Sequence, residues 1–541
     1  MATFDAIVAG SGMTGGWAAK ELAERGLKVL MVERGPNLEH RVDYKTEFTN
    51  PWELPFRGFT DPQELATTKR IQRFARLNEW VKDMFVDDDA EPYQTPQESG
   101  FLWMRGYHLG GRSVMWGRHS YRMSDTHFEA NAKDGNGVDW PIRYKDISPW
   151  YDHVEQFIGV NGTVENIPSC PDGRYQPSMG LNAGEQRLAD LIRSKYEDRR
   201  LIPGRTANLT QPVGDRTPCQ HRNQCARGCS FGAYFCTQSS TLPAARATGR
   251  LTLLTDTIVE SVDYDPKTRR ATGVRLINAR TGERTTETSK IVFLCTGSIN
   301  TASLLLRSVS DATPGGLGNS SGMLGRYVMD HGFGVGAAST IPGIEDQVYT
   351  GRKPNGIIIP RFVNMKGQET DFTRGYSYQG GCNRQTWNRG GNMAGIGADF
   401  KQQMRKPGDW VINIGASIEC LPRPDNRVTV DFRNRDRHGL PLTQIDVRFG
   451  DNERKAAAHA HKEALAMLSL LGGRIVNSNP VLGPPGLAIH EMGGACMGKD
   501  PRTSVTNALN QLHDVPNVFV TDGACMSSTG DRNPSLTYMA L

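Results

Sequence analysis

A glycine-rich turn near the start of the chain constrains the fold most. Residues 4–35, "FDAIVAGSGMTGGWAAKELAERGLKVLMVERG", contain an apolar run, a turn, an amphipathic stretch and a second apolar run, which predicts strand, helix and strand. Gly10, Gly12 and Gly15 form G-x-G-x-x-G where the first strand meets the helix. In nucleotide-binding folds these glycines permit a tight turn, the approach of a pyrophosphate and close packing of helix on strand. Glu33 ends the second strand, where a carboxylate binds ribose hydroxyls. A dinucleotide site is therefore predicted, and the motif does not separate FAD from NAD.

The bulk composition limits the classes of protein to which the chain can belong. Its 541 residues suffice for two or more domains, and 38% hydrophobic with 22% charged residues is ordinary for a globular protein. The net charge of +5 is dilute, and acids and bases are interspersed, so we expect no nucleic-acid partner. No apolar run reaches the roughly 18 residues of a membrane span. The first residues lack the pattern of a signal peptide, which by itself predicts the cytoplasm or export by a route that this chain does not encode.

Four of the ten cysteines fall in residues 219–236, "CQHRNQCARGCSFGAYFC". Zinc prefers half-sites of C-x2-4-C, so only the middle interval, C-x3-C, fits. A redox dithiol usually shows C-x-x-C, and disulfides need an oxidising compartment. An iron–sulfur cluster accepts irregular spacing, and Arg222 and Arg227 would favour thiolates. From the residues alone, a cluster, a zinc site and unligated cysteines all stay open.

Several further motifs carry a family resemblance. They are "GYHLGGRSVMWG", "KIVFLCTGSINTASLLLRS", "AIHEMGGACMG" and the C-terminal "NVFVTDGACMSSTGDRNPSLTYMAL". Together with the N-terminal motif they resemble the FAD-dependent glucose–methanol–choline (GMC) oxidoreductases. Within that family the chain looks most like the large catalytic subunits of bacterial glucose, fructose, gluconate and glucoside 3-dehydrogenases.

The resemblance implies an α/β fold, in which a Rossmann-like FAD-binding domain is joined to a sheet-based α+β substrate domain. Residues 1–125, 215–309 and 487–541 would form the FAD-binding domain, with the cysteine-rich loop 219–236 in its second part. Residues 126–214 would supply substrate-domain and connecting segments, and residues 310–486 the substrate-binding domain. Relatives usually complete a further helix beyond the ending "LTYMAL", so a truncated C-terminus is expected.

The resemblance also assigns cofactor contacts. Residues expected to hold the ADP half of FAD are Gly10, Gly12, Gly15 and Glu33, with the backbone of Val259 at the adenine edge. Those expected along the pyrophosphate, ribityl and flavin are Gly110, Gly111, Ser113, Asp522, Gly523, Asn533 and Pro534. Met115 stands where several relatives carry a histidine, which in pyranose oxidases bonds covalently to FAD, so non-covalent FAD is expected.

For the chemistry, the resemblance assigns His490 as the base and Asn533 as its partner on the substrate hydroxyl. Histidine suits the task because its unperturbed pKa of about 6.5 lies near working pH. In the glucose and fructose dehydrogenase subunits that the chain resembles, the ligands of a [3Fe–4S] cluster follow C-x5-C-x3-C, and the resemblance therefore assigns Cys219, Cys225 and Cys229 as cluster ligands. Cys236 would be a spectator or the fourth ligand of a [4Fe–4S] form.

The predicted function is oxidation of a secondary alcohol of a sugar or glycoside, with C3 of a glucoside as the favoured position. Electrons would leave through the cluster to a c-type cytochrome. The alternatives are a glucose 1-, gluconate 2- or fructose 5-dehydrogenase subunit, and an FAD oxidase that uses O2. A non-catalytic flavoprotein or redox sensor is disfavoured by the presence of both His490 and Asn533. A small helper subunit with a twin-arginine signal would export the chain to the periplasm and provide any membrane contact; without such a partner the chain would be cytoplasmic.

Overall fold

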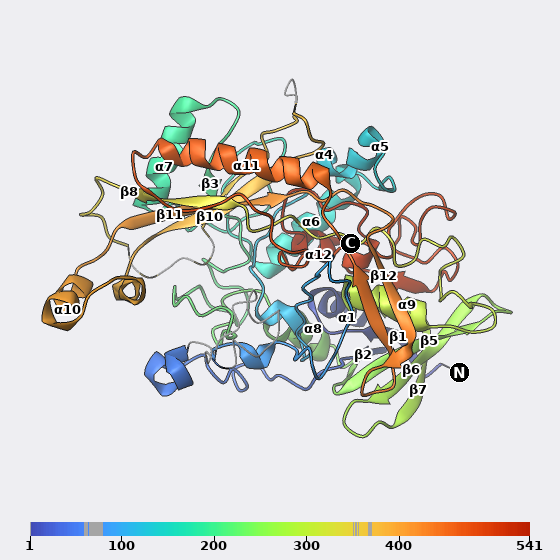
Figure 1. Ribbon diagram of the computed structural model, residues 1–541. Coiled ribbons are helices and arrows are strands. Elements are labelled where there is room, and N and C mark those ends of the chain that lie inside the picture. The colour runs from blue at the N-terminus through green and yellow to red at the C-terminus, as the bar shows by residue number, and fades with distance from the viewer. Residues whose placement is uncertain are drawn as a thin grey trace.

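The computed structural model describes residues 2–58, 63, 79–349, 351, 354, 356–365 and 370–541. The chain forms two large sheets that lie at opposite ends of the molecule, and the C-terminal segment runs between them (Figure 1). In the described part of the chain, no helix is long and apolar enough to cross a membrane. The predicted α/β fold with two sheet-based parts is confirmed.

The first sheet has seven strands. Their order is β4 (Leu251–Leu254), β2 (Val29–Val32), β1 (Phe4–Ala9), β7 (Arg284–Leu294), β6 (Arg270–Asn278) and β5 (Thr257–Asp265), with β15 (Val518–Val520) also paired to β7. The pairs β1–β2, β1–β7, β2–β4 and β7–β15 are parallel, whereas β5, β6 and β7 form an antiparallel meander. Every residue of β2 is buried, as expected for a parallel strand covered on both faces.

Helices follow the strands of this sheet as the sequence predicts. β1 leads through the glycine turn into α1 (Met13–Glu24), which packs against α8 (Thr241–Ala247). β7 leads into α9 (Ser298–Arg307), and β15 leads through a loop to α12 (Ser535–Ala540). Pro534 is the N-cap of α12, immediately before its first residue. The strand–helix–strand unit at the N-terminus and the two later strand-to-helix connections are therefore confirmed.

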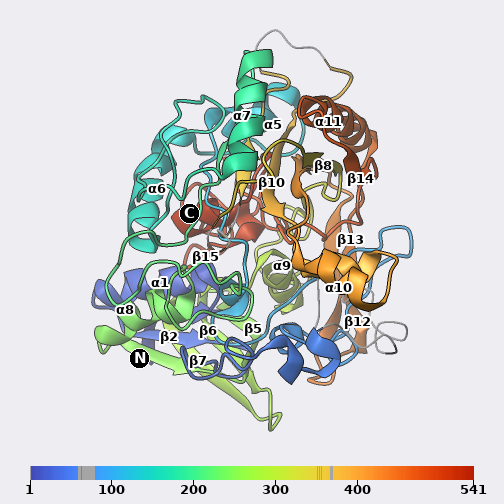
Figure 2. The ribbon, with the colours of Figure 1, turned by 90° about the vertical axis from the view of Figure 1, so that its left-hand side faces the viewer.

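The second sheet is antiparallel and has six strands. Their order is β14 (Ile475–Asn479), β8 (Gly336–Ile341), β11 (Trp410–Ile418), β10 (Tyr376–Arg384), β9 (Ile357–Ile359) and β3 (Ile202–Pro203). α11 (Asp451–Ser469) packs on β8 and β11, and α7 (Ala183–Lys195) packs on β10 and β11 (Figure 2). Because side chains alternate along a strand, β10 has two different faces. Tyr376 and Tyr378 bond to residues of α11, while Ser377 and Gln379 bond to the C-terminal loop.

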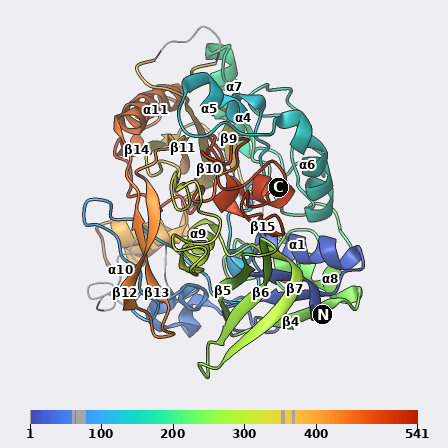
Figure 3. The same cartoon turned by 90° about the vertical axis from the view of Figure 1, so that its right-hand side faces the viewer.

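The remaining elements complete the frame. β12 (Arg427–Arg435) and β13 (Pro441–Asp446) form a separate ribbon beside α9 (Figure 3). α6 (Tyr144–Ile158) packs against α12, and α4 (Asp125–Phe128), α5 (Ala130–Asp134) and α10 (Gly397–Arg405) are shorter. The short 3-10 elements are η1 (Pro51–Glu53), η2 (Pro55–Gly58), η3 (Lys82–Met84), η4 (Gly111–Val114), η5 (Thr237–Ser239), η6 (Trp387–Asn392) and η7 (Gly523–Cys525).

The first sheet thus takes its strands from the three segments predicted to bind FAD, and the second takes its strands from residues 126–214 and 310–486. The predicted segment boundaries themselves stay a prediction.

Candidate active site

A cavity of about 1120 Å³ lies between the two sheets and is lined by both. Its volume exceeds the roughly 300–1,000 Å³ of an ordinary small-molecule site, which leaves room for a large cofactor and a substrate. Predicted cofactor residues that line it are Gly10, Gly12, Glu33, Gly111, Ser113, Val259, Asp522, Gly523 and Asn533. Three predicted cofactor residues, Gly15, Gly110 and Pro534, are not among its lining residues in the described chain.

Each glycine of the turn is required for a different structural reason. Gly10 has φ +93°, and a Cβ there would lie 2.5 Å from the carbonyl oxygen of Cys295. A Cβ at Gly15 would lie 1.9 Å from the carbonyl oxygen of Gly10, so Gly15 lets α1 pack on the turn. A Cβ at Gly12 would have no described atom within 4 Å. Gly12 is also the N-cap of α1, where unsatisfied N–H groups and the helix dipole favour anions. The open space at this position fits a pyrophosphate.

Glu33 lies at the end of β2, on the wall of the same cavity. Its carboxylate accepts hydrogen bonds from the backbone N–H of Ser11 (3.1 Å) and of Gly35 (2.8 Å), and from the Ser11 hydroxyl. Burial raises the pKa of Glu33 despite these donors. Val259 lies in β5 nearby, and its carbonyl accepts a hydrogen bond from Arg307 (2.8 Å). The predicted contacts of Glu33 with ribose and of Val259 with adenine stay predictions.

The predicted flavin end is built from η4 and η7. Gly110 and Gly111 have φ values of +84° and +48°, and a Cβ at Gly110 would collide with the Gln238 amide. The Ser113 hydroxyl donates to the Gly110 carbonyl (2.6 Å) and accepts from the Thr237 N–H (3.1 Å), which fixes the turn.

Asp522 lies where β15 enters η7. One carboxylate oxygen accepts from the Ala524 N–H (2.9 Å); the other accepts from the Gly297 N–H (2.8 Å) and the Thr301 hydroxyl (2.6 Å). Burial raises the pKa of Asp522 to about 6. Its side chain therefore joins the end of β15 to the start of α9 at the cavity wall.

His490 and Asn533, predicted as the catalytic pair, lie together on the cavity wall. The Asn533 amide nitrogen is 3.1 Å from His490 Nε2. Gln379 of β10, to which sequence analysis gave no role, donates from its amide to Asn533 Oδ1. On the far side of the base, His490 Nδ1 is 3.1 Å from His331 Nδ1.

The surroundings keep the His490 ring neutral. Burial lowers the pKa of His490 well below 6.5, and the nearby His331, His119 and Arg112 lower it further. A neutral imidazole at pH 7 can accept a proton, so the arrangement can perform general base catalysis on a hydroxyl group in the cavity.

Comparisons with known proteins agree with this geometry. Residues 203–332 and 422–541 match two models described as GMC oxidoreductase. The chain is 26% identical to the fructose dehydrogenase large subunit of Gluconobacter japonicus, over 99% of this chain and 96% of the relative. It is 28% identical to a 2-methyl-1,2-propanediol dehydrogenase of Mycolicibacterium austroafricanum, over 99% and 93%. The chain belongs to the GMC oxidoreductase family. Its fold matches that of pyridoxine 4-oxidase from Mesorbium loti, with a TM-score of 0.60, 15% identity and coverage of 99% of this chain and 97% of the other.

Membership of the GMC family makes the chain a flavin oxidoreductase that acts on CH–OH donors, which confirms the predicted enzyme class. FAD fits the residues present, because the cavity joins an open, glycine-lined helix N-terminus at Gly12 to the pair of His490 and Asn533. Met115 also lines the cavity, and the absence of a covalent flavin bond stays a prediction.

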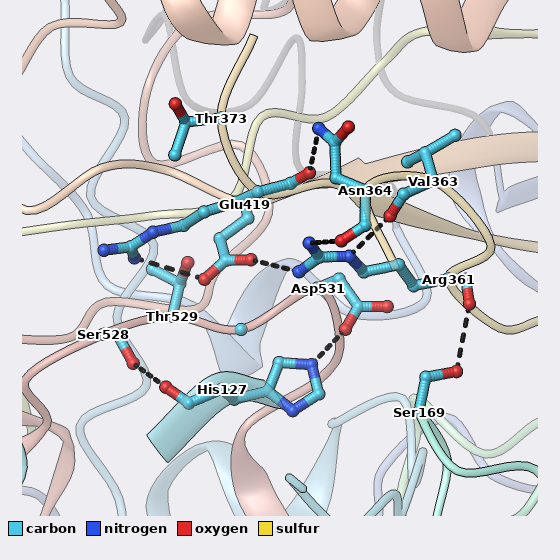
Figure 4. Close-up of polar contacts among 12 residues, drawn as sticks. His127, Ser169, Arg361, Val363, Asn364, Thr373, Glu419, Ser528, Thr529 and Asp531 are labelled. Atoms are coloured by element: carbon cyan, nitrogen blue, oxygen red, sulfur yellow. Dashed lines mark hydrogen bonds and ion pairs between the residues drawn. The ribbon is translucent and has the colours of Figure 1, made fainter. Parts of the chain in front are cut away.

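The loop that carries Asn533 in this GMC enzyme rests on a buried polar network (Figure 4). The imidazole of His127 bonds to the carboxylate of Asp531, and both side chains are fully buried. The Ser377 hydroxyl donates to the Asp531 carbonyl. Glu419, another residue without a role from the sequence, lies between Arg361 (3.4 Å) and Arg374 (3.2 Å). The network holds the buried Asp531, two residues before Asn533, which itself lines the cavity.

His108 and His119 flank the stretch that contains Gly110, Gly111 and Ser113 in the sequence. His108 is buried, and its Nδ1 is 3.1 Å from the Leu109 carbonyl. His119 stacks on Tyr121, and it also lines the cavity and affects the pKa of His490. Its place beside the base could not be foreseen from its flanking residues.

The cysteine run lies beside the same cavity. Residues 223, 224, 226 and 227, which lie between the predicted ligands, line it. Cys219, Cys225 and Cys229 are half-buried, and Cys225 lies close enough to Cys219 and Cys229 to help raise the pKa of those two thiols. Cys236 is buried, with its sulfur 3.1 Å from the Ser239 hydroxyl. Burial is the main cause that raises the pKa of Cys219 and Cys229, and at Cys219 it outweighs nearby positive charge.

The spacing of the sulfurs bears on the kind of metal. Among the described residues, the only three or more His, Cys, Asp or Glu side chains with ligand atoms mutually within 4.8 Å are Asp330, His331 and His490. A zinc ion would hold thiolates about 2.3 Å from itself, and thus nearer to one another than that limit. The cysteine loop is therefore more open than a single-zinc site, and an iron–sulfur cluster there stays a prediction.

Proposed function

We propose that this GMC enzyme is a dehydrogenase that oxidises a secondary alcohol of a sugar or glycoside, with C3 of a glucoside as the first choice. The observation that carries the proposal is the contact of Asn533 with a neutral, half-buried His490 at the wall of a cavity shared by both sheets. The relatives include an enzyme named for fructose. Polar side chains such as Gln379, His119 and Arg118 line the cavity and suit a substrate with several hydroxyl groups.

The residues divide the work of alcohol oxidation. His490 Nε2 takes the proton of the substrate hydroxyl, and the Asn533 amide donates a hydrogen bond to the same oxygen. The C–H hydrogen leaves as a hydride with its electron pair, so a carbonyl forms. Bound FAD, held by the residues around Gly12, Glu33 and Ser113, supplies the hydride acceptor. Gln379 fixes the Asn533 amide so that its N–H₂ faces His490.

The cysteine loop provides the proposed electron exit. Cys219, Cys225 and Cys229 would hold a [3Fe–4S] cluster, which supplies one-electron transfer to an acceptor outside the chain. Four residues between these cysteines, Asn223, Gln224, Ala226 and Arg227, line the same cavity as the predicted flavin contacts, which supports this role. The natural acceptor would be a c-type cytochrome, and a helper subunit with a twin-arginine signal would carry the chain to the periplasm.

The test is a product and acceptor assay on purified enzyme. Glucose, gluconate, fructose and a methyl glucoside are each incubated with ferricyanide or with O2, and the products are identified by NMR. The proposal predicts a 3-keto glucoside, ferricyanide reduction and little peroxide. Oxidation of another hydroxyl would instead identify the enzyme as the corresponding sugar dehydrogenase. Abundant peroxide without iron would identify it as an oxidase. An EPR signal from the as-isolated protein is expected for an oxidised [3Fe–4S] cluster, whereas zinc or an oxidised [4Fe–4S] cluster would be silent.

A further inference from the structure

A second histidine lies directly behind the catalytic base. His331 is 1% exposed, and its ring is perpendicular to that of His490, with centroids 5.0 Å apart. Its Nε2 is 3.0 Å from the carbonyl oxygen of Gly530, and its Nδ1 is 3.1 Å from His490 Nδ1. No step of the mechanism above uses this residue.

The hydrogen bonds around His331 have only one consistent direction. The Gly530 carbonyl can only accept, so His331 Nε2 carries a proton and donates it. Burial lowers the pKa of His331 to about 4, so the ring is neutral and its Nδ1 is an acceptor. His490 Nδ1 must then be the donor in the contact between the two rings. Because a neutral imidazole has a single N–H, His490 Nε2 is left with its lone pair.

The hydrogen bonds on the cavity side of His490 run in the same direction. Gln379 donates to Asn533 Oδ1, so the Asn533 N–H₂ group faces His490 Nε2 and donates to it. The direction therefore holds over all four contacts, from Gln379 to the Gly530 carbonyl. These four hydrogen bonds leave His490 Nε2 unprotonated, and this is the nitrogen that must accept the substrate proton.

We infer that His331 is a positioning residue that fixes the tautomer of His490, by accepting its Nδ1–H and donating in turn to the Gly530 carbonyl. Without this acceptor, His490 could carry its proton on Nε2, which would block the base. The inference rests on the proposed function only for the role of His490.

Asp330, the neighbour of His331, fixes the backbone of the segment that carries His490. Its Oδ1 accepts from the His490 N–H (3.0 Å), and its Oδ2 accepts from the N–H groups of Gly486 (2.8 Å) and Ala488 (3.2 Å). Asp330, His331 and His490 lie close enough to bind a metal ion. Both Asp330 oxygens are instead engaged by backbone donors, and each histidine already has a partner, which favours a hydrogen-bonded relay.

The test measures the tautomer and the rate separately on the holoenzyme. The protein is labelled with ¹⁵N-histidine, and the His490 signals are assigned by their loss in His490→Asn. Wild type should show protonated Nδ1 and unprotonated Nε2. In His331→Leu a population with protonated Nε2 should appear, and the rate constant of anaerobic flavin reduction by substrate should fall roughly 10²-fold, the lower end of a general-base contribution, with KM unchanged.

A rescue variant and a control separate positioning from mere packing. His331→Asn places an amide oxygen where Nδ1 was, and it should keep the wild-type tautomer and most of the rate. His461→Leu removes a half-exposed histidine that bonds to Ser478, away from the cavity lining, and it should change neither quantity. A wild-type His490 with its proton on Nε2, a zinc-dependent shift of both His331 and His490 signals at stoichiometric metal, or equal losses in the Leu and Asn variants would each overturn the inference. If His331→Leu does not fold, the wild-type and Asn spectra still decide, and they do so whether or not any sugar is oxidised.

Discussion

Replacing Asp531 by Asn should loosen the loop that carries Asn533. Asp531 and Arg532 are both fully buried, and Asp531 Oδ1 accepts from Arg532 Nη2 (2.7 Å) and from His127. Burial by itself raises the pKa of Asp531, but the charge of Arg532 and the bond from His127 outweigh it and hold that pKa well below its usual range. The substitution keeps the shape of the side chain and leaves the Arg532 guanidinium without its counter-charge.

The magnitude follows from the cost of an uncompensated buried charge. Breaking a buried ion pair by removing one partner costs about 3–5 kcal/mol. If the substitution lowers the free energy of local opening of the loop by this amount, hydrogen exchange of the loop amides should become roughly 150- to 4,000-fold faster, since about 1.4 kcal/mol is a factor of ten. Bonded backbone N–H groups in the loop and the adjoining α12 include that of Met526, which donates to the Gly523 carbonyl (3.2 Å), and that of Tyr538, which donates to the Pro534 carbonyl (3.0 Å).

The assay is hydrogen–deuterium exchange of the holoenzyme, read on peptides that cover residues 523–541. The matched control is Asp500→Asn, which removes an exposed pair with Arg502 and should leave these peptides unchanged. Flavin reduction by substrate should slow in Asp531→Asn, because Asn533 loses its fixed position. A rise in exchange of less than tenfold with normal flavin reduction would refute the reasoning, since it would show that the buried pair does not hold the loop.

Three further predictions follow from the site. Because the pKa of His490 is lowered and the base must be unprotonated, flavin reduction should stay constant as pH falls through 6.5 and decline only at lower pH; a pH profile with half the activity lost at or above 6.5 would contradict this. Gly12→Ala should fold normally but lose FAD, because its Cβ enters the open space predicted to hold the pyrophosphate. Gly15→Ala should instead lose about 1–3 kcal/mol of stability, because its Cβ clashes with the turn. Flavin content and thermal unfolding distinguish the two variants, and equal behaviour would contradict the separate roles. Cys236→Ser should retain the EPR signal of a three-iron cluster and Cys225→Ser should lose it, and loss of the signal in Cys236→Ser would point to a four-iron cluster.

The parts of the fold that sequence predicted are those specified by neighbouring residues. The run from Phe4 to Val32 contains a buried strand, a glycine turn and an amphipathic helix in sequence, so its pattern is sufficient to define β1, α1 and β2. The same holds for β7 followed by α9, where a strand ends at Leu294 and a helix starts at Ser298.

Identification of the predicted catalytic pair required more than local pattern. His490 and Asn533 are 43 residues apart in the sequence, and they meet because segments on either side pair with distant elements, such as Met492 with Met329. The sequence identified them only through a family resemblance, and the structure supplies the reason that they touch.

Gln379 and His331 could not be assigned from sequence for a physical reason. Alternation along "YSYQGG" predicts that Tyr378 and Gln379 face opposite sides of a strand. Which side faces the cavity depends on α11 covering the other one. His331 depends on a loop that returns to the Gly530 carbonyl, 199 residues later. Contacts of this kind are set by tertiary packing, which no local signal records.

Anaerobic stopped-flow reduction of the bound flavin tests the central claim most directly. Wild-type enzyme and a His490→Asn variant with normal flavin content are mixed with glucose, gluconate, fructose and a methyl glucoside in turn. The account predicts that at least one of these sugars bleaches the flavin of the wild type, and that the same sugar reduces the variant at least roughly 10²-fold more slowly, as expected when a general base is removed. Failure of every sugar to reduce the wild type, or an equal rate in the variant, would contradict it.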